Sequence, residues 1–131
     1  MATKQVELKT LKEGSYIVVD GEPSRIVSYQ TAKTGKHGSM KARVDAIGIM
    51  DNQRRSIVKP VSTKVETPII TRNIAQITHI QGNTLGLMDM ETYESFEATI
   101  SDDLEGTPIE GAEIEFITAM GRRKMVRVKG G

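Results

Sequence analysis

A short basic stretch, Lys33 to Lys41, holds the residues of this 131-residue chain that are best suited to chemistry. Its centre, Gly35-Lys36-His37-Gly38, places one lysine between two glycines, which lack a Cβ and readily adopt positive φ. Such a turn can be tight and leaves the amine of Lys36 unshielded. The concentrated positive charge suits a polyanion or an acidic pocket of a partner. The residues near Lys36 that carry or can carry a positive charge are Lys33, His37, Lys41 and Arg43.

Motifs for catalysis do not accompany this lysine. A P-loop requires a glycine five residues before Gly35 and Ser or Thr after the lysine, but the chain has Gln30 and His37 at these positions. An ordinary lysine amine is almost fully protonated at neutral pH, so a partner must activate it before it can act as a nucleophile. We therefore interpret Lys36 as an acceptor in another enzyme's reaction, and we expect no catalytic residue in this chain.

Metal binding is not indicated either. The only histidines, His37 and His79, lie far apart in the sequence, and the chain has no cysteine, so the ligand spacing of a structural zinc site is missing. The acidic residues Asp102, Asp103 and Glu105 are expected in a solvated turn and not in a cation site. We predict no metal site and no bound cofactor.

Composition indicates an ordinary globular protein, with 37% hydrophobic and 27% charged residues. The absence of cysteine excludes disulfides and fits a reducing compartment. The longest uninterrupted apolar run, Tyr16 to Val19, is far too short for a membrane helix. We expect a cytoplasmic protein without membrane contact.

Charge is distributed unevenly along the chain. Met1 to Val65 contains 12 Lys or Arg against 6 Asp or Glu, a net +6, whereas Glu66 to Gly131 contains 6 against 11, a net −5. Attraction to phosphate decays within about 10 Å at ordinary salt, so the basic half should bind polyanions locally while the acidic part repels them.

Short segments with β character follow one another and are separated by turn residues, and helical periodicity is not sustained anywhere. Asp20-Gly21 is a strong hairpin signal. This pattern is typical of small barrels. The expected strands are 15–20, 24–31, 40–50, 56–61, 69–80, 84–90, 95–100, 113–120 and 124–128.

Proline residues bracket the stretch from Pro60 to Pro68, and this places a domain boundary near Pro68. We expect domains at 1–68 and 69–131, the first carrying the lysine loop. The segment Ser101 to Gly111 offers at most one helical turn because glycine and proline interrupt it. In the second domain, Phe96 and Phe116 are expected in the core, while Tyr93 lies beside a turn.

Several separated blocks of the chain resemble translation initiation factor 5A in its archaeal form, a family related to bacterial elongation factor P. The resemblance covers Val6 to Lys129. Ser24 and Ala32 depart from the cysteine and serine often found there, and Ser39-Met40 is one of several variants after the second glycine. The blocks are Leu11 to Tyr16, Asp20 to Pro23, Lys33 to Arg43, Val65 to Ile70 and Leu87 to Tyr93.

This resemblance implies an all-β fold, an N-terminal SH3-like barrel followed by a C-terminal OB-fold barrel. It also implies that Lys36 is converted to hypusine or deoxyhypusine. In the family, deoxyhypusine synthase attaches an aminobutyl group from spermidine and uses NAD. The residues that would support the modification are Thr34, Gly35, His37 and Gly38.

The function implied is that of a monomeric translation factor that contacts rRNA and ribosomal proteins and positions peptidyl-tRNA for peptide bond formation. RNA backbone would be held by Lys33, Lys36, Lys41 and Arg43. One alternative is a general RNA-binding protein or RNA chaperone that acts through its basic surfaces without the modification. Another is an enzyme that uses Lys36 as a Schiff-base nucleophile, although the sequence offers no substrate pocket for it.

Overall fold

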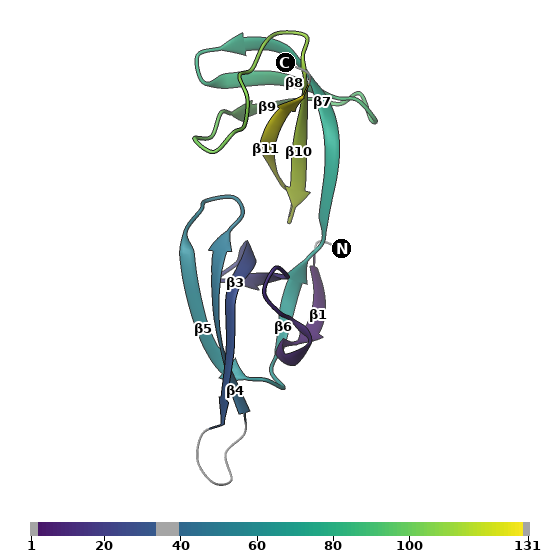
Figure 1. The fold of residues 1–131 in the computed structure, drawn as a ribbon. Helices are drawn as coiled ribbons and strands as arrows, with labels where there is room; N and C mark the ends of the chain where they lie inside the picture. Colours follow the sequence, from purple (N-terminus) through teal and green to yellow (C-terminus); the bar gives the residue numbers. More distant parts are fainter. Residues whose placement is uncertain (1–2, 34–39, 130–131) are drawn as a thin grey trace. The chain divides into compact units, whose positions relative to one another are not determined.

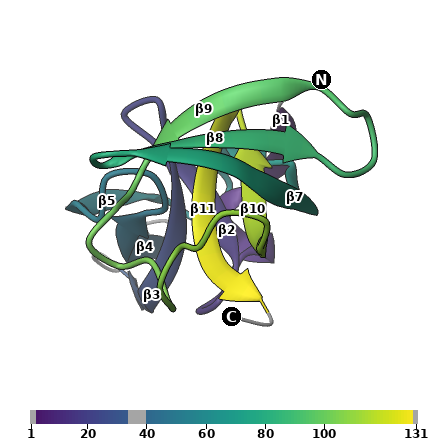
Figure 2. The same cartoon turned by 90° about the horizontal axis from the view of Figure 1, so that it is seen from above.

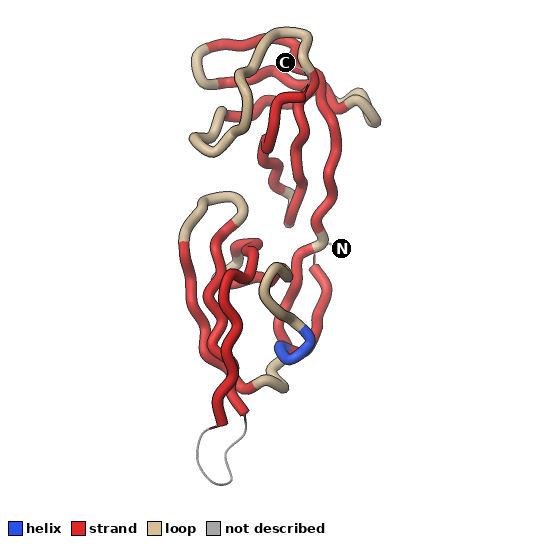
Figure 3. The backbone as a smooth tube through the Cα atoms, in the orientation of Figure 1, coloured by secondary structure: helices blue, strands red, loops and turns tan. Residues whose placement is uncertain are grey.

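The computed structural model describes residues 3–33 and 40–129. Their regular structure is eleven β-strands and one three-residue 3-10 helix, which confirms the predicted all-β fold class (Figures 1 and 3). The contacts divide the chain into two compact units, Met1–Ile69 and Ile70–Gly131.

The first unit contains a four-stranded antiparallel sheet in the order β2-β3-β4-β5 and a two-stranded ribbon of β1 and β6. The ribbon is tied to the sheet where the Thr67 hydroxyl donates to the Tyr16 carbonyl oxygen at 2.8 Å. Its elements are β1 (Thr3–Glu7), the 3-10 helix η1 (Leu8–Thr10), β2 (Tyr16–Val19), β3 (Glu22–Lys33), β4 (Met40–Gly48), β5 (Arg54–Pro60) and β6 (Lys64–Pro68).

Apolar side chains fill the space between this sheet and the ribbon, as in an SH3-like barrel. Leu8, carried by η1, is fully buried among them. The Tyr29 hydroxyl donates to the Leu8 carbonyl oxygen at 3.0 Å and fixes η1 against β3. The remaining members of this core are Ile17, Val19, Ile26, Ala42, Val44 and Ala46.

The second unit is a five-stranded antiparallel sheet in the order β11-β10-β7-β8-β9, which curls so that β9 and β11 come together (Figure 2). This is the strand order of the predicted OB-fold, a partly open Greek-key barrel. Phe116 is 1% exposed and its ring lies 5.3 Å from that of Phe96, as expected for core residues. The strands are β7 (Ile70–Gln81), β8 (Thr84–Asp89), β9 (Ser95–Thr99), β10 (Glu113–Ala119) and β11 (Arg122–Lys129).

Three elements differ from the sequence expectations. β1 and β6 pair with each other where no strand was expected, because their pairing joins segments about sixty residues apart and leaves no local signal. The 3-10 helix η1 was not expected either. Residues 101–111 are described and form no helix, which agrees with the expectation of at most one turn there.

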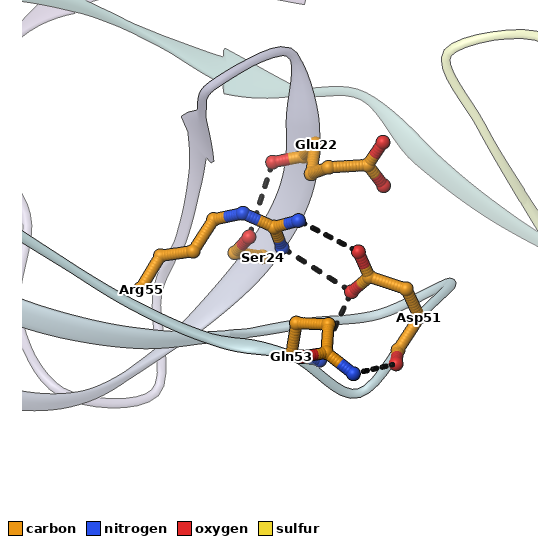
Figure 4. Close-up of polar contacts among 5 residues, drawn as sticks. All are labelled: Glu22, Ser24, Asp51, Gln53 and Arg55. Carbon is orange, nitrogen blue, oxygen red and sulfur yellow. Dashed lines mark hydrogen bonds and ion pairs between the residues drawn. The ribbon is translucent and has the colours of Figure 1, made fainter.

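The turn between β4 and β5 is held by Asp51 (Figure 4). The Arg55 guanidinium donates to both Asp51 carboxylate oxygens, at 3.2 and 2.8 Å, and the Gln53 backbone N–H donates to Oδ1 at 3.0 Å. A Cβ at Gly48 would lie 2.0 Å from that Oδ1, so only glycine admits the carboxylate here. The hydrogen bonds from Arg55 and Gln53 lower the pKa of Asp51 to about 2.

Ser24, at the start of β3, is fully buried beneath the same turn region. Its hydroxyl donates to the Glu22 carbonyl oxygen at 3.1 Å, which satisfies the buried polar group (Figure 4).

We predict that Asp51→Asn lowers the free energy of unfolding at neutral pH by about 1 kcal/mol, because a charge-assisted pair at a partly exposed site is lost. The folded pKa of Asp51 lies below its ordinary value of 3.8, so its contribution is complete above about pH 4 and disappears as pH falls toward 2. Urea unfolding of both proteins at pH 6, 4 and 2.5 should show a shrinking difference. A difference that stays constant over this range would contradict the assignment.

We also predict that Phe116→Ala destabilises the second unit by about 3 to 5 kcal/mol, because it empties the centre of a closed core. Urea titration followed by the NMR signals of β7 to β11 measures this. Ile109→Ala is the control, since Ile109 is 53% exposed and its truncation should change stability by no more than about 0.5 kcal/mol. Equal losses for the two variants would contradict the described core.

Candidate functional site

The hairpin of β3 and β4 brackets the segment that the sequence singled out. The two strands lie side by side and stay paired as far as Lys33 opposite Met40 (Figure 1). Lys36 therefore belongs to the connection between two paired strand ends. Residues 34–39 lie outside the described residues, so the structure does not place Thr34, Gly35, Lys36, His37 or Gly38.

The other predicted RNA-binding residues are described and reach solvent. Lys33 ends β3 and Lys41 lies near the start of β4, and both are exposed. Arg43 follows two residues later, on the same face of β4 as Lys41, with 61% of its side chain exposed. Lys41 and Arg43 can thus meet an anion from the same side.

Arg43 is part of an ion-pair cluster that the sequence analysis missed. The carboxylate of Asp45 lies 3.7 Å from Arg43 Nη2 and 3.8 Å from Arg54 Nη2, and it accepts a short hydrogen bond from the Ser56 hydroxyl. This hydrogen bond and the two guanidinium charges lower the pKa of Asp45 and outweigh the opposing effect of its burial. Asp45 is therefore an anion that holds two arginines from adjacent strands.

The sequence places Asp45 at an outward position in the alternation of β4. In the structure Asp45 is nevertheless only 8% exposed. Its pairing with Arg54 depends on the register of β4 and β5, in which Asp45 lies opposite Ser56, and the sequence alone does not specify that register.

The OB-fold unit presents a shallow hollow of about 270 Å³ on β7, β8 and β9. His79 is an exposed residue of β7. Its ring packs over Gly86 so closely that a Cβ atom at Gly86 would lie 2.0 Å from the His79 ring. Phe96, also in the lining, is covered by the Arg123 guanidinium at 4.3 Å from the ring centroid. The charged lining residue is Glu97, which repels phosphate, so this hollow suits single-stranded nucleic acid poorly.

Tyr93, whose exposure the sequence left open, is 70% exposed and adopts φ of 62°. The carboxylate of Asp89 supports this turn by accepting from the backbone N–H groups of Glu91 and Thr92, at 2.8 and 3.1 Å. Tyr93 is thus an aromatic side chain held outward beside three acidic residues, Asp89, Glu91 and Glu94.

Asp102, Asp103 and Glu105 are exposed, and Asp102 and Asp103 form a turn, as the sequence predicted. Asp103 pairs with Lys124 at 2.6 Å, and Glu105 forms a parallel bridge with Arg127. Within residues 3–33 and 40–129, no group of three or more histidine or acidic side chains is arranged to hold a metal ion. In the same ranges, no helix has the length and apolar character needed to cross a membrane.

Comparison with known proteins gives a consistent result. The family model "Translation initiation factor 5A-like, N-terminal" matches residues 1–63. The chain is 54% identical to "Translation initiation factor 5A" of Methanothermobacter thermautotrophicus, over 99% of this chain and 100% of that relative. It is 53% identical to the protein of the same name in Methanosphaera stadtmanae, over 100% and 99%.

A solved structure agrees with both units. The structure of "eukaryotic translation initiation factor 5A from Methanococcus jannaschii" superimposes with a TM-score of 0.89 at 42% identity, over 99% of each chain. The likeness spans the barrel, the hairpin that brackets Lys36 and the OB-fold unit. The chain therefore belongs to the translation initiation factor 5A family.

Proposed function

We propose that this translation factor acts through a hypusine or deoxyhypusine side chain at Lys36. The observation that carries the proposal is the position of Gly35-Lys36-His37-Gly38 between the paired ends of β3 and β4, in a chain of this family. The strand ends that flank it carry exposed lysines, Lys33 and Lys41, so the charge near the acceptor is strongly positive.

In this proposal Lys36 is the substrate of a modifying enzyme and this chain supplies no catalytic group. Deoxyhypusine synthase would transfer the aminobutyl group of spermidine to the amine, with 1,3-diaminopropane as the leaving group. NAD would take a hydride to form the imine that the amine attacks and would then return it, so no net oxidation occurs. The synthase would desolvate that amine in its own pocket, which lowers the cost of removing its proton. The product is a longer side chain with a second ammonium group, and this chain needs no bound cofactor.

The modified side chain would then act on the ribosome in the cytoplasm. It would reach along the CCA end of peptidyl-tRNA, neutralise phosphates and favour the geometry for peptide bond formation. Lys33, Lys41 and Arg43 would hold RNA backbone without reading its sequence. rRNA and ribosomal proteins complete the binding site of a monomeric factor.

A second candidate function has one observation in its favour. Lys33, Lys41 and Arg43 are exposed together on the hairpin, and such cations bind RNA whether or not Lys36 is modified. A general RNA-binding protein or chaperone would need no more than this, so the two functions are separated by their dependence on Lys36.

We predict that Lys36→Arg abolishes the acceleration of slow peptide bonds, because arginine keeps the charge but cannot accept the aminobutyl group. The measurement uses ribosomes of the source organism and protein treated with deoxyhypusine synthase, spermidine and NAD. We expect a loss of about tenfold or more in the rate, as when a well-placed contact in the transition state is removed.

The matched control is Lys12→Arg, which changes another exposed lysine of the first unit that belongs to neither β3 nor β4. It should keep the full acceleration. If Lys36→Arg is also fully active, the general RNA-binding function is favoured and the proposal fails.

A further inference from the structure

The outer face of the sheet formed by β3, β4 and β5 is unusually rich in cations. Alternation along β4 places Ala42, Val44 and Ala46 in the core, each at most 1% exposed, and sends the residues between them outward. The outward residues of β4 are Lys41, Arg43, Asp45 and Ile47.

Strand register extends this face onto the neighbouring strands. Ile47 lies opposite Arg25 of β3 and Arg54 of β5, both exposed. Arg43 lies opposite Gln30 of β3, four positions along β4 from Ile47. Rows of outward residues follow one another about 7 Å apart along the strands. The basic face therefore runs from Arg25 and Arg54 through Arg43 to Lys41, toward the strand ends that bracket Lys36.

Asp45 organises the middle of this face. It is the acidic residue among these outward positions, and its side chain is only 11% exposed. Arg43 and Arg54 approach its two carboxylate oxygens from adjacent strands, and the Ser56 hydroxyl donates to it from the row between them. Two positive charges around one nearly buried negative charge leave an excess of positive charge at the surface.

Both arginines keep donors free for a ligand. Their side chains are 61% and 62% exposed, although each makes one contact with Asp45. In the described part of the chain, neither pairs with a second carboxylate. A guanidinium has five N–H donors in a rigid planar arrangement that matches phosphate. One contact with Asp45 therefore orients the group and leaves other N–H donors available for a ligand.

We propose that this face binds the phosphate backbone of RNA, with Arg43 and Arg54 as phosphate ligands and Asp45 as the residue that positions them. The inference rests on the proposed function for Arg43, and it adds Arg54, Asp45 and a direction along the sheet. Four exposed cations on this face favour RNA over an acidic protein. They are Arg25, Lys41, Arg43 and Arg54, and the exposed large apolar side chain beside them is that of Val58, opposite Arg43. The centre of a protein interface is usually apolar and depleted of charge.

The test is the affinity of the unmodified protein for fluorescently labelled deacylated tRNA, measured by anisotropy between 50 and 200 mM KCl. We expect Arg54→Gln to weaken binding about tenfold and to reduce the slope of log affinity against log salt by about 1. Because Lys36 is unmodified here, the result is independent of the peptide bond assay and separates this inference from the proposed function.

The chain offers a closely matched control in Arg72→Gln. Arg72 is 59% exposed and makes one contact of 3.6 Å with a carboxylate, Glu115, that is itself only 15% exposed. It differs from Arg54 mainly in lying on the second unit. Equal effects of the two variants on tRNA binding would overturn the proposal, as would an Arg54→Gln variant that loses binding to polyglutamate but not to tRNA.

Asp45→Asn tests positioning separately from charge. Removing an anion from a phosphate-binding face should tighten binding if only net charge matters. We expect binding about threefold weaker instead, because the arginines lose their common anchor while Ser56 can still donate to the amide oxygen. Circular dichroism checks that the variant folds, and tighter tRNA binding by the folded variant would overturn the positioning role.

Discussion

Period-two alternation along β4 is the constraint on which the rest of the first unit depends. One side of the strand packs Ala42, Val44 and Ala46 into the barrel core, and the other side presents Lys41 and Arg43. A slip of one residue in register would exchange these sides, burying charge and exposing the core, so packing fixes the face as firmly as it fixes the fold. The same pairing brings Lys33 opposite Met40 and so defines where the connection that contains Lys36 begins and ends.

The cations of the two units differ in how they are paired with acidic side chains. In the second unit, three cations of β11 are paired with acids of that unit: Arg123 contacts Glu94 at 2.6 Å, Lys124 contacts Asp103 at 2.6 Å and Arg127 contacts Glu115 at 3.0 Å. In the first unit, one nearly buried carboxylate, Asp45, serves two arginines and leaves them largely exposed. The basic half of the sequence therefore becomes a basic surface, whereas the basic end of the second half is largely neutralised by its neighbours.

Local chemistry made much of this structure predictable. Asp20 and Gly21 have φ of 52° and 78°, the hairpin turn that this dipeptide predicts, and the strands of the second unit lie within about two residues of their expected bounds. The registers of β1 with β6 and of β4 with β5 were not predictable. The pairing of β1 with β6 and the contact of Asp45 with Arg54 both depend on registers set by tertiary packing. The role of Lys36 came from the family resemblance and the glycines beside it, and it stays a prediction because residues 34–39 lie outside the described residues.

The central claim is that the β3–β4 hairpin holds one lysine for modification. Peptide mapping by tandem mass spectrometry, on protein isolated from its source organism, tests this claim most directly. The account predicts the added aminobutyl mass on Lys36, with Lys33 and Lys41 unmodified, and no such mass on protein made in bacteria. An unmodified Lys36 in the native protein, or the added mass on either neighbouring lysine, would contradict it.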